Sequence, residues 1–234
     1  GSMYDKAQRI SNLGSHLKEI FNFSFKEIYK RTFLISKCDL TTEMVKEFTS
    51  LQGVVGSHYS RSQGYSSIES DALLEQYKPI SAKDFCPKSE LSICLSLANK
   101  IDDIVGAFLI GKKPTGSKDP FGLRRCALGI IRILIENKID FNLFEFLNYS
   151  SSLYLVESVK KKHILDEIIT FINIRMVVHF QSLGITQDFI KSVFKIDEFN
   201  PYIIFYKCKT LISFINKEEG QKFVAAYKRI DSIL

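Results

Sequence analysis

The segment 91–110, LSICLSLANKIDDIVGAFLI, decides the fold class of this 234-residue chain. Its apolar residues recur at steps of three and four positions, which places them along one side of a helix. These residues are Leu91, Cys94, Leu95, Ala98, Ile101, Val105 and Phe108. The segment therefore predicts a long helix with one side buried in a protein core.

Helical periodicity continues through most of the chain on either side of this segment. Further helices are predicted at 5–22, 25–36, 42–48, 67–77, 121–135, 162–182, 186–195, 201–216 and 220–233. Irregular stretches are predicted at 50–65, 78–88 and 111–119. No two alternating segments are joined by an Asn-Gly or Asp-Gly hairpin signal. The sequence therefore predicts an all-α protein.

Capping residues support these helix starts. Ser66 has Glu69 three positions later, which is the spacing of a capping box. Asp119 is followed by Pro120, and aspartate is a strong N-cap while proline is tolerated at the first helical position. We therefore expect a helix to begin directly after Asp119.

Composition places the chain among ordinary globular proteins. Hydrophobic residues make up 45% and charged residues 25% of the sequence. No stretch approaches the roughly 20 apolar residues of a membrane span, and no signal peptide opens the chain. Residues 1–3 are interpreted as an expression scar, outside the fold. These features predict a cytoplasmic protein with no membrane contact.

Cysteines and histidines form no pattern with an obvious chemistry. The five cysteines are Cys38, Cys86, Cys94, Cys126 and Cys208, and the four histidines occur singly. No CxxC pair, HExxH motif or Cys-His arrangement is present. We therefore predict reduced thiols that serve mainly as small core residues, with no metal ligands and no catalytic residues.

The net charge of +6 lies entirely in the second half of the chain. Residues 1–110 hold 13 Lys/Arg and 13 Asp/Glu, whereas residues 111–234 hold 19 and 13. A one-sided basic excess points to a polyanionic partner such as tRNA, although solubility alone explains it equally well.

The basic excess begins at 111–118, GKKPTGSK. This is not a Walker A loop, because Ser and Lys come in reversed order and a helix rather than a strand precedes it. A basic loop that leads into a helix N-terminus suits phosphate binding instead. The tRNA-binding candidates are Lys112, Lys113, Lys118, Arg125 and Arg132. For the arginines at 124 and 125 we favour internal ion pairs with Asp102, Asp103 or Asp119 over RNA contact.

Two stretches resemble a known family. One is 37–48, KCDLTTEMVKEF, continued by LQGVVG at 51–56, and the other contains PTGSKDPFGLRR at 114–125. Together they closely resemble the beta chain of the bacterial glycyl-tRNA synthetase that is built from two alpha and two beta chains. The similarity is dense from 37 to 135, and AYKRI at 226–230 looks like the stretch that leads into that family's anticodon-binding module.

The resemblance implies a role in a tRNA ligase. In that family the alpha chain activates glycine with ATP and Mg²⁺, and the beta chain is needed for tRNA(Gly) binding and charging. The beta chains are much longer, so we expect this chain to be an internal fragment without a cofactor of its own. It implies an HD-like helical domain at 4–158 and, at 159–234, a helical connector into a truncated anticodon-binding module. The basic run 160–162 is expected to be a solvated linker at the boundary.

The resemblance also implies a degenerate HD pocket. In active HD enzymes, histidines and aspartates bind the metal that activates water. The pocket residues here are Cys38, Asp39, Asn99, Asp102 and Asp103. Cys38 replaces the histidine, and Asn99 replaces a later aspartate, so a divalent ion should bind poorly. Asp39 is then interpreted as a helix-capping residue, with Thr41 and Thr42 as competitors. The alternatives are a metal-dependent HD phosphohydrolase and a spacer domain that touches the alpha chain without meeting RNA.

Overall fold

The computed structural model describes residues 2–155, 158–194 and 199–231. Its α-helices are α1 (Met3–Ile20), α2 (Arg31–Ile35), α3 (Glu43–Glu47), α4 (Val54–Ser62), α5 (Ser67–Glu75), α6 (Glu90–Leu109), α7 (Leu123–Glu136), α8 (Leu143–Ser152), α9 (Ser158–Ser182), α10 (Gln187–Val193), α11 (Pro201–Ile215) and α12 (Glu218–Asp231). Three short 3-10 helices are η1 (Glu27–Lys30), η2 (Cys38–Thr41) and η3 (Thr49–Leu51). No strand occurs in these ranges, so the all-α prediction is confirmed. The HD-like character of the bundle stays a prediction.

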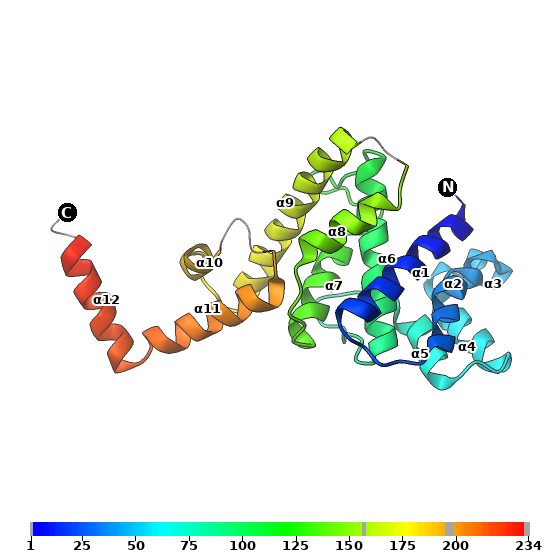
Figure 1. The fold of residues 1–234 in the computed structure, drawn as a ribbon, viewed down its shortest axis with the longest axis horizontal. Helices are drawn as coiled ribbons and strands as arrows, with labels where there is room; N and C mark the ends of the chain where they lie inside the picture. Colours follow the sequence, from blue (N-terminus) through cyan, green and yellow to red (C-terminus); the bar gives the residue numbers. More distant parts are fainter. Residues whose placement is uncertain (1, 156–157, 195–198, 232–234) are drawn as a thin grey trace.

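Helix α6 is the centre of the fold (Figure 1). It packs against α1, α5, α7, α8 and α9. The sequence predicts burial of one side only, but the polar side chains of Ser92, Asn99 and Asp102 are buried as well. Neighbouring helices therefore surround α6, and most of its buried polar atoms are expected to pair inside the protein.

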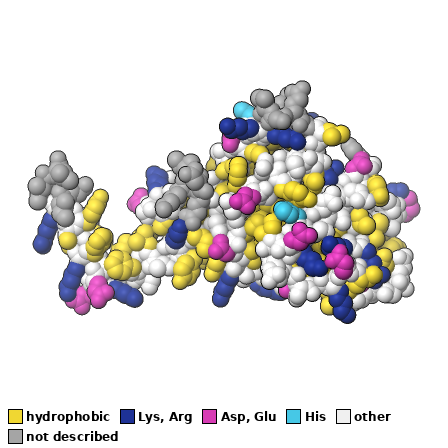
Figure 2. Space-filling model, viewed as in Figure 1, with side chains coloured by type: hydrophobic (Ala, Val, Ile, Leu, Met, Phe, Trp, Pro, Cys, Tyr) yellow, Lys and Arg dark blue, Asp and Glu magenta, His cyan; other side chains and the backbone are white. Residues whose placement is uncertain are grey.

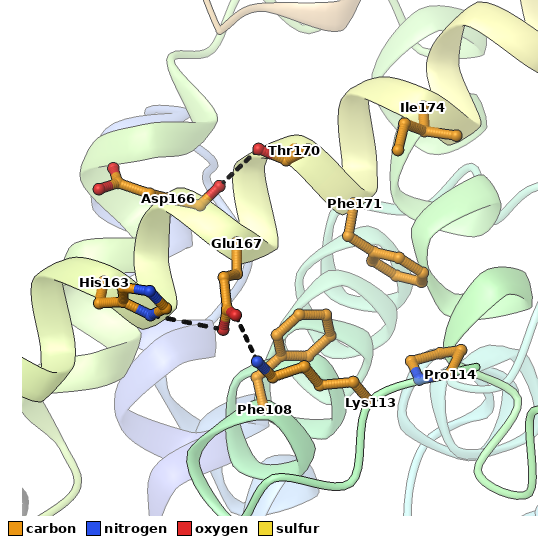
Figure 3. Close-up of a pocket in the computed structure, with 9 residues that line it drawn as sticks. All are labelled: Phe108, Lys113, Pro114, His163, Asp166, Glu167, Thr170, Phe171 and Ile174. Carbon is orange, nitrogen blue, oxygen red and sulfur yellow. Dashed lines mark hydrogen bonds and ion pairs between the residues drawn. The ribbon is translucent and has the colours of Figure 1, made fainter.

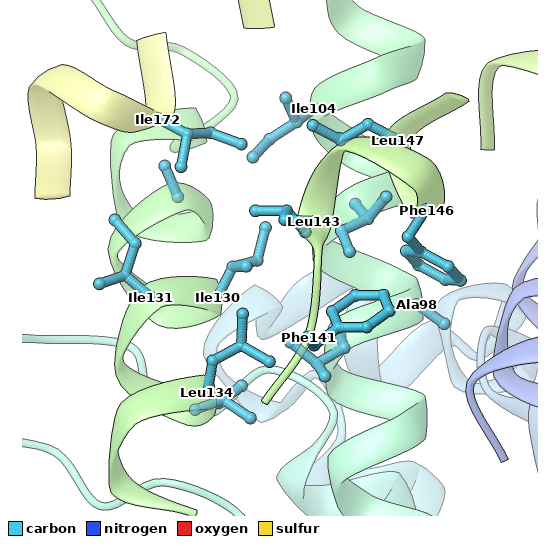
Figure 4. Close-up of a cluster of buried hydrophobic side chains, with 14 of the residues drawn as sticks. Ala98, Ile104, Ile130, Ile131, Leu134, Phe141, Leu143, Phe146, Leu147 and Ile172 are labelled. Carbon is cyan, nitrogen blue, oxygen red and sulfur yellow. The ribbon is translucent and has the colours of Figure 1, made fainter. Parts of the chain in front are cut away.

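The main core lies between α6, α7, α8 and α9 (Figure 4). Ile104, Ile130, Leu147 and Ile172 come from these four helices, and each is 0% exposed. Burying an aliphatic side chain of this size contributes about 1.5–3 kcal/mol. Three of the cysteines, at 86, 94 and 208, are buried free thiols, as predicted, whereas Cys38 is exposed.

Capping residues set most helix starts. Ser66 and Glu69 form the predicted capping box, with the backbone N–H of Ser66 donating to Glu69 Oε2 at 2.9 Å. Thr42 caps α3 by accepting from the backbone N–H of Val45 at 3.3 Å, so the proposed cap role of Asp39 is wrong. Ser2, which was left out of the predicted fold, caps α1.

The helix predicted to start after Asp119 begins at Leu123 instead. Residues 120–122 make a turn in which Gly122 has φ +64°, a conformation that glycine adopts without strain. The Asp119 carboxylate still accepts from the backbone N–H of Leu123 at 2.9 Å and of Arg124 at 3.0 Å. Asp119 therefore caps the helix from four residues before its start.

Three other boundaries differ from the prediction. Helix α4 lies inside the stretch 50–65 that was predicted to be irregular, and it begins just after Gly53, whose φ is +82°. Helix α8 was not predicted. The predicted helix 25–36 divides into η1 and α2.

The helices from α9 onward lead progressively away from the core. Helix α9 packs against α6, α7 and α8, and α11 contacts α7 and α10. The basic run 160–162 lies within α9, so its interpretation as a linker is wrong; the division of the chain into two domains stays a prediction. Beyond α11 the chain forms an arm with α12 (Figure 1), on which Figure 2 shows exposed hydrophobic side chains. Within the described ranges, no helix is long and apolar enough to cross a membrane.

Candidate functional site

A polar hollow lies between η3, the end of α5, α6 and the start of α7. We call it the α6–α7 cleft, with a volume of about 570 Å³. The residues that matter for its chemistry are Tyr77, Asn99, Lys100, Asp103, Phe121 and Arg125. Three of the predicted site residues, at 99, 103 and 125, therefore meet in one place.

The other predicted pocket residues do not line this cleft. Cys38 and Asp39 border a separate hollow of about 230 Å³ together with Gly56 and Tyr59. The buried Asp39 carboxylate accepts from the backbone N–H of Gly53 at 2.7 Å through Oδ2. A Cβ atom at position 56 would lie 3.3 Å from this carboxylate, so glycine there makes room for Asp39. Although the residue as a whole is exposed, partial desolvation of the thiol, with a smaller contribution from Asp39, raises the pKa of Cys38.

Asp102 is occupied by a salt-bridge network. Its carboxylate accepts from Arg9 Nε at 2.7 Å, Lys6 Nζ at 3.2 Å and the hydroxyl of Tyr154 at 2.7 Å. Burial alone would raise the pKa of Asp102, but these partners outweigh it and hold the pKa below its usual value. Lys6 also binds Oδ1 of Asp103 at 2.5 Å. Asp102 thus fastens α1 to α6.

The predicted pocket residues are divided between two hollows and the Asp102 network. Among the residues that the structure describes, no group of three or more His, Cys, Asp or Glu side chains is arranged to hold an ion. Oδ1 of Asp39 and Oδ1 of Asn99 are both buried without a hydrogen-bond partner.

Two buried lysines stand beside the pocket residues. Lys37 Nζ donates to Gln76 Oε1 at 2.8 Å and to the hydroxyl of Tyr77 at 2.9 Å. Lys100 Nζ donates to the backbone oxygens of Gln76 at 3.2 Å and Lys78 at 2.6 Å, and to Ser96 Oγ at 2.7 Å. Burial lowers the pKa of Lys37 to about 7 and that of Lys100 to about 8.

The sequence reasoning missed both lysines. The signal for Lys100 is its place in a strongly apolar helix, four residues after Ser96 on the same side. A Cβ atom at Gly129 of α7 would lie 2.6 Å from Cε of Lys100, so this glycine leaves room for the lysine stem.

The basic loop 111–118 projects from the end of α6. Lys112, Lys113 and Lys118 are all exposed, as expected for residues that contact a partner. Lys113 forms an ion pair with Glu167 of α9 beside a hollow of about 380 Å³ (Figure 3). Phe108 and Phe171 form apolar walls of this hollow. The loop is therefore anchored to α9 at one of its three lysines.

Arg124 and Arg125, which follow this loop, do not form the ion pairs that were predicted for them. Arg124 Nη2 donates to the backbone oxygen of Gly116 at 2.5 Å, which ties α7 to the basic loop. Arg125 has its guanidinium against Gly122 at the cleft. No ion pair joins either arginine to a carboxylate among the described residues, so that prediction is wrong.

Arg132 is a correction to the tRNA-binding candidates. It is 7% exposed. Its guanidinium donates to the backbone oxygens of Ser81 at 2.9 Å and Asp84 at 2.7 Å, and to Glu136 Oε1 at 2.8 Å. Because every side of the guanidinium is occupied inside the protein, Arg132 holds the loop 78–88 against α7 rather than meeting an RNA.

Comparison with known proteins adds an independent observation. The family described as "Glycyl-tRNA synthetase beta subunit" matches residues 1–195 of this chain. A glycine–tRNA ligase beta subunit from Sulfurihydrogenibium sp. is 37% identical over 234 residues, which is 100% of this chain and 32% of the relative. The beta subunits of Shewanella halifaxensis and Persephonella marina are 35% and 34% identical, again over 100% of this chain and over 34% and 35% of their own lengths. The chain spans about a third of the length of these relatives.

Proposed function

The chain belongs to the glycyl-tRNA synthetase beta subunit family, and from this we propose that it is a non-catalytic part of glycine–tRNA ligase that supports tRNA(Gly) binding. In this proposal the alpha subunit performs the chemistry with ATP and Mg²⁺, in a cytoplasmic assembly of two alpha and two beta chains. This chain needs no cofactor and serves to position the RNA.

The basic loop 111–118 is the observation that carries the proposal. Lys112 and Lys118 are exposed and have no ion pair within the described part of the chain. Arg124 holds the loop at Gly116, and the ion pair of Lys113 with Glu167 holds it against α9. Lysines on an anchored loop can contact phosphates with little loss of backbone entropy on binding.

Charge reversal in the reconstituted tetramer tests the proposal. The double variant Lys112→Glu/Lys118→Glu, in a full-length beta chain, should weaken tRNA(Gly) binding by at least tenfold and lower charging efficiency. If two phosphate contacts are lost, the slope of log affinity against log salt should fall by about 1.8. Filter binding at several salt concentrations and aminoacylation kinetics provide the readouts.

A charge-matched control separates local from general electrostatics. Lys26→Glu/Lys83→Glu reverses two other exposed lysines and makes the same change in net charge. The control should bind tRNA nearly as well as the wild type. Equal affinity and charging in the loop variant and the wild type would instead assign the domain to a spacer role. Stoichiometric metal with phosphatase activity would point to a phosphohydrolase.

A further inference from the structure

Arg125 lines the α6–α7 cleft, and its guanidinium has no hydrogen-bond or ion-pair partner among the described residues. The neighbouring Arg124 and Arg132 both donate to backbone oxygens, but no hydrogen bond or ion pair of the Arg125 guanidinium occurs in the described part of the chain. A Cβ atom at Gly122 would lie 2.8 Å from its Nη2, so the bare glycine lets the guanidinium lie over the turn. An unoccupied planar guanidinium suits bidentate binding of a phosphate.

An aromatic ring stands beside this arginine. Phe121 lines the cleft and is 55% exposed. An exposed phenylalanine next to a basic group is the arrangement on which a nucleobase stacks, and such stacking contributes about 1–3 kcal/mol per base. The turn 119–122 and the first turn of α7 therefore place a ring and a cation at the same cleft.

Two residues with acceptor oxygens, Asn99 and Asp103, also line the cleft. Asn99 is 2% exposed, and its Oδ1 has no partner. Asp103 uses Oδ1 to bind Lys6, and Oδ2 accepts no hydrogen bond from the described residues. Buried polar atoms are nearly always paired, so an unpaired carboxamide oxygen beside a hollow needs a donor from outside the chain. Hydroxyl and amino groups are such donors.

The charges around the cleft favour an anion. Lys78, Lys100 and Arg125 line it against the single carboxylate of Asp103. Lys78 pairs with Asp84 at 3.1 Å, and Lys100 gives all three of its hydrogen bonds to protein oxygens. Only Arg125 among these cations remains available for direct contact, while Lys100 keeps the wall rigid.

We propose that the α6–α7 cleft binds a single nucleotide, with the phosphate on Arg125, the base stacked on Phe121, and the hydroxyl or amino groups donating to Asn99 and Asp103. The cleft volume of about 570 Å³ suits a ligand of this size. The nucleotide is either a free mononucleotide or the unpaired end of an RNA. The second source rests on the proposed function, whereas the first does not.

Calorimetric titration of the 234-residue chain with AMP, adenosine and inorganic phosphate tests the site. AMP should bind most tightly, because adenosine lacks the phosphate and inorganic phosphate lacks the base. Arg125→Ala and Phe121→Ala should each weaken AMP binding at least tenfold. Arg61→Ala is the matched control: it removes another exposed guanidinium, which does not line the cleft, and should leave AMP binding unchanged.

A short single-stranded RNA distinguishes the two sources. If a trinucleotide binds tighter than AMP and the same two variants weaken it, the ligand is an RNA end; if AMP binds as tightly, the ligand is a free nucleotide. No binding of AMP or the trinucleotide at millimolar concentration, or binding that ignores Arg125→Ala and Phe121→Ala, would overturn the inference. Either failure leaves the proposed function intact, because that function depends on Lys112 and Lys118, which lie outside the cleft.

Discussion

The guanidinium of Arg9 donates two hydrogen bonds to the carboxylate of Asp102, from Nε to Oδ1 at 2.7 Å and from Nη2 to Oδ2 at 3.2 Å. The two residues are 93 positions apart and join α1 to α6. The Asp102 side chain is 1% exposed, so water cannot replace its partners. The pair therefore holds the N-terminal helix α1 against α6.

Asp102→Asn should destabilise the fold by about 3–5 kcal/mol, because it removes one partner of a buried charged network. Asp103→Asn is the control: its side chain is 35% exposed, and loss of its pair with Lys6 should cost about 1 kcal/mol or less. Urea unfolding followed by circular dichroism measures both. Equal losses of unfolding free energy in the two variants would contradict this role of Asp102.

Acid should weaken the fold through Glu69. Burial on its own raises the pKa of this carboxyl, but hydrogen bonds from Arg31 and Ser66 outweigh burial and lower the pKa to about 2. A carboxyl with a lowered pKa stabilises the fold above its unfolded value of 4.5, and this contribution is lost as pH falls toward about 2.

Glu69→Gln should therefore flatten the dependence of unfolding free energy on pH between about 4.5 and 2. At neutral pH it should cost about 1.5–3 kcal/mol, the range for hydrogen bonds to a charged group. Asp71 pairs with Arg61 on the surface, so Asp71→Asn is the control. Its unfolding free energy should depend on pH as that of the wild type does. Unchanged acid sensitivity in the Glu69 variant would refute this assignment.

Arg132→Ala should destabilise the protein by about 2–4 kcal/mol, because it leaves the carbonyl oxygens of Ser81 and Asp84 without their donor. Arg125→Ala should change stability by less than about 0.5 kcal/mol, since its guanidinium has no partner in the described chain. Thermal unfolding compares them. A stable Arg132 variant with weakened tRNA binding would restore Arg132 as an RNA contact.

Gly14→Ala tests the packing of α1 on α2. A Cβ atom at position 14 would overlap the ring of the buried Phe33, so the ring or the helices must shift. We expect a loss of about 1–3 kcal/mol, despite the better helix propensity of alanine. Asn12→Ala gives a similar propensity gain at an exposed position of α1 and should be neutral or stabilising. Denaturant unfolding separates the two.

Local signals predicted the helices with clear periodicity but missed α4, which follows a glycine, and α8, which does not. Helix α4 begins after Gly53 and contains Gly56, which reads as a loop in the sequence. The carboxylate of Asp39, 14 positions before Gly53, accepts the backbone N–H of Gly53 at the start of α4, and a Cβ atom at Gly56 would lie 3.3 Å from this carboxylate. A contact between distant segments overrode the local preference, and no window of sequence contains it.

Only part of the candidate site could be predicted, because spacing along one helix is visible in the sequence and contacts between distant segments are not. Asn99 and Asp103 lie one helical turn apart on α6, so spacing alone places them on one side. Arg125 and Arg132, seven positions apart, also share a side of α7, yet one reaches the cleft and the other is buried under the loop 78–88. Where that loop folds back depends on tertiary contacts that helical periodicity does not encode.

The central position of α6 governs how the molecule opens. The helices α1, α5, α7, α8 and α9 all pack against α6. None of them can detach without exposing part of its buried surface to water. Amide hydrogens in the middle of α6 should then exchange with deuterium only through global unfolding, all at one slow rate. The amides of α12, out on the arm, should exchange orders of magnitude sooner, because α12 packs mainly against α11.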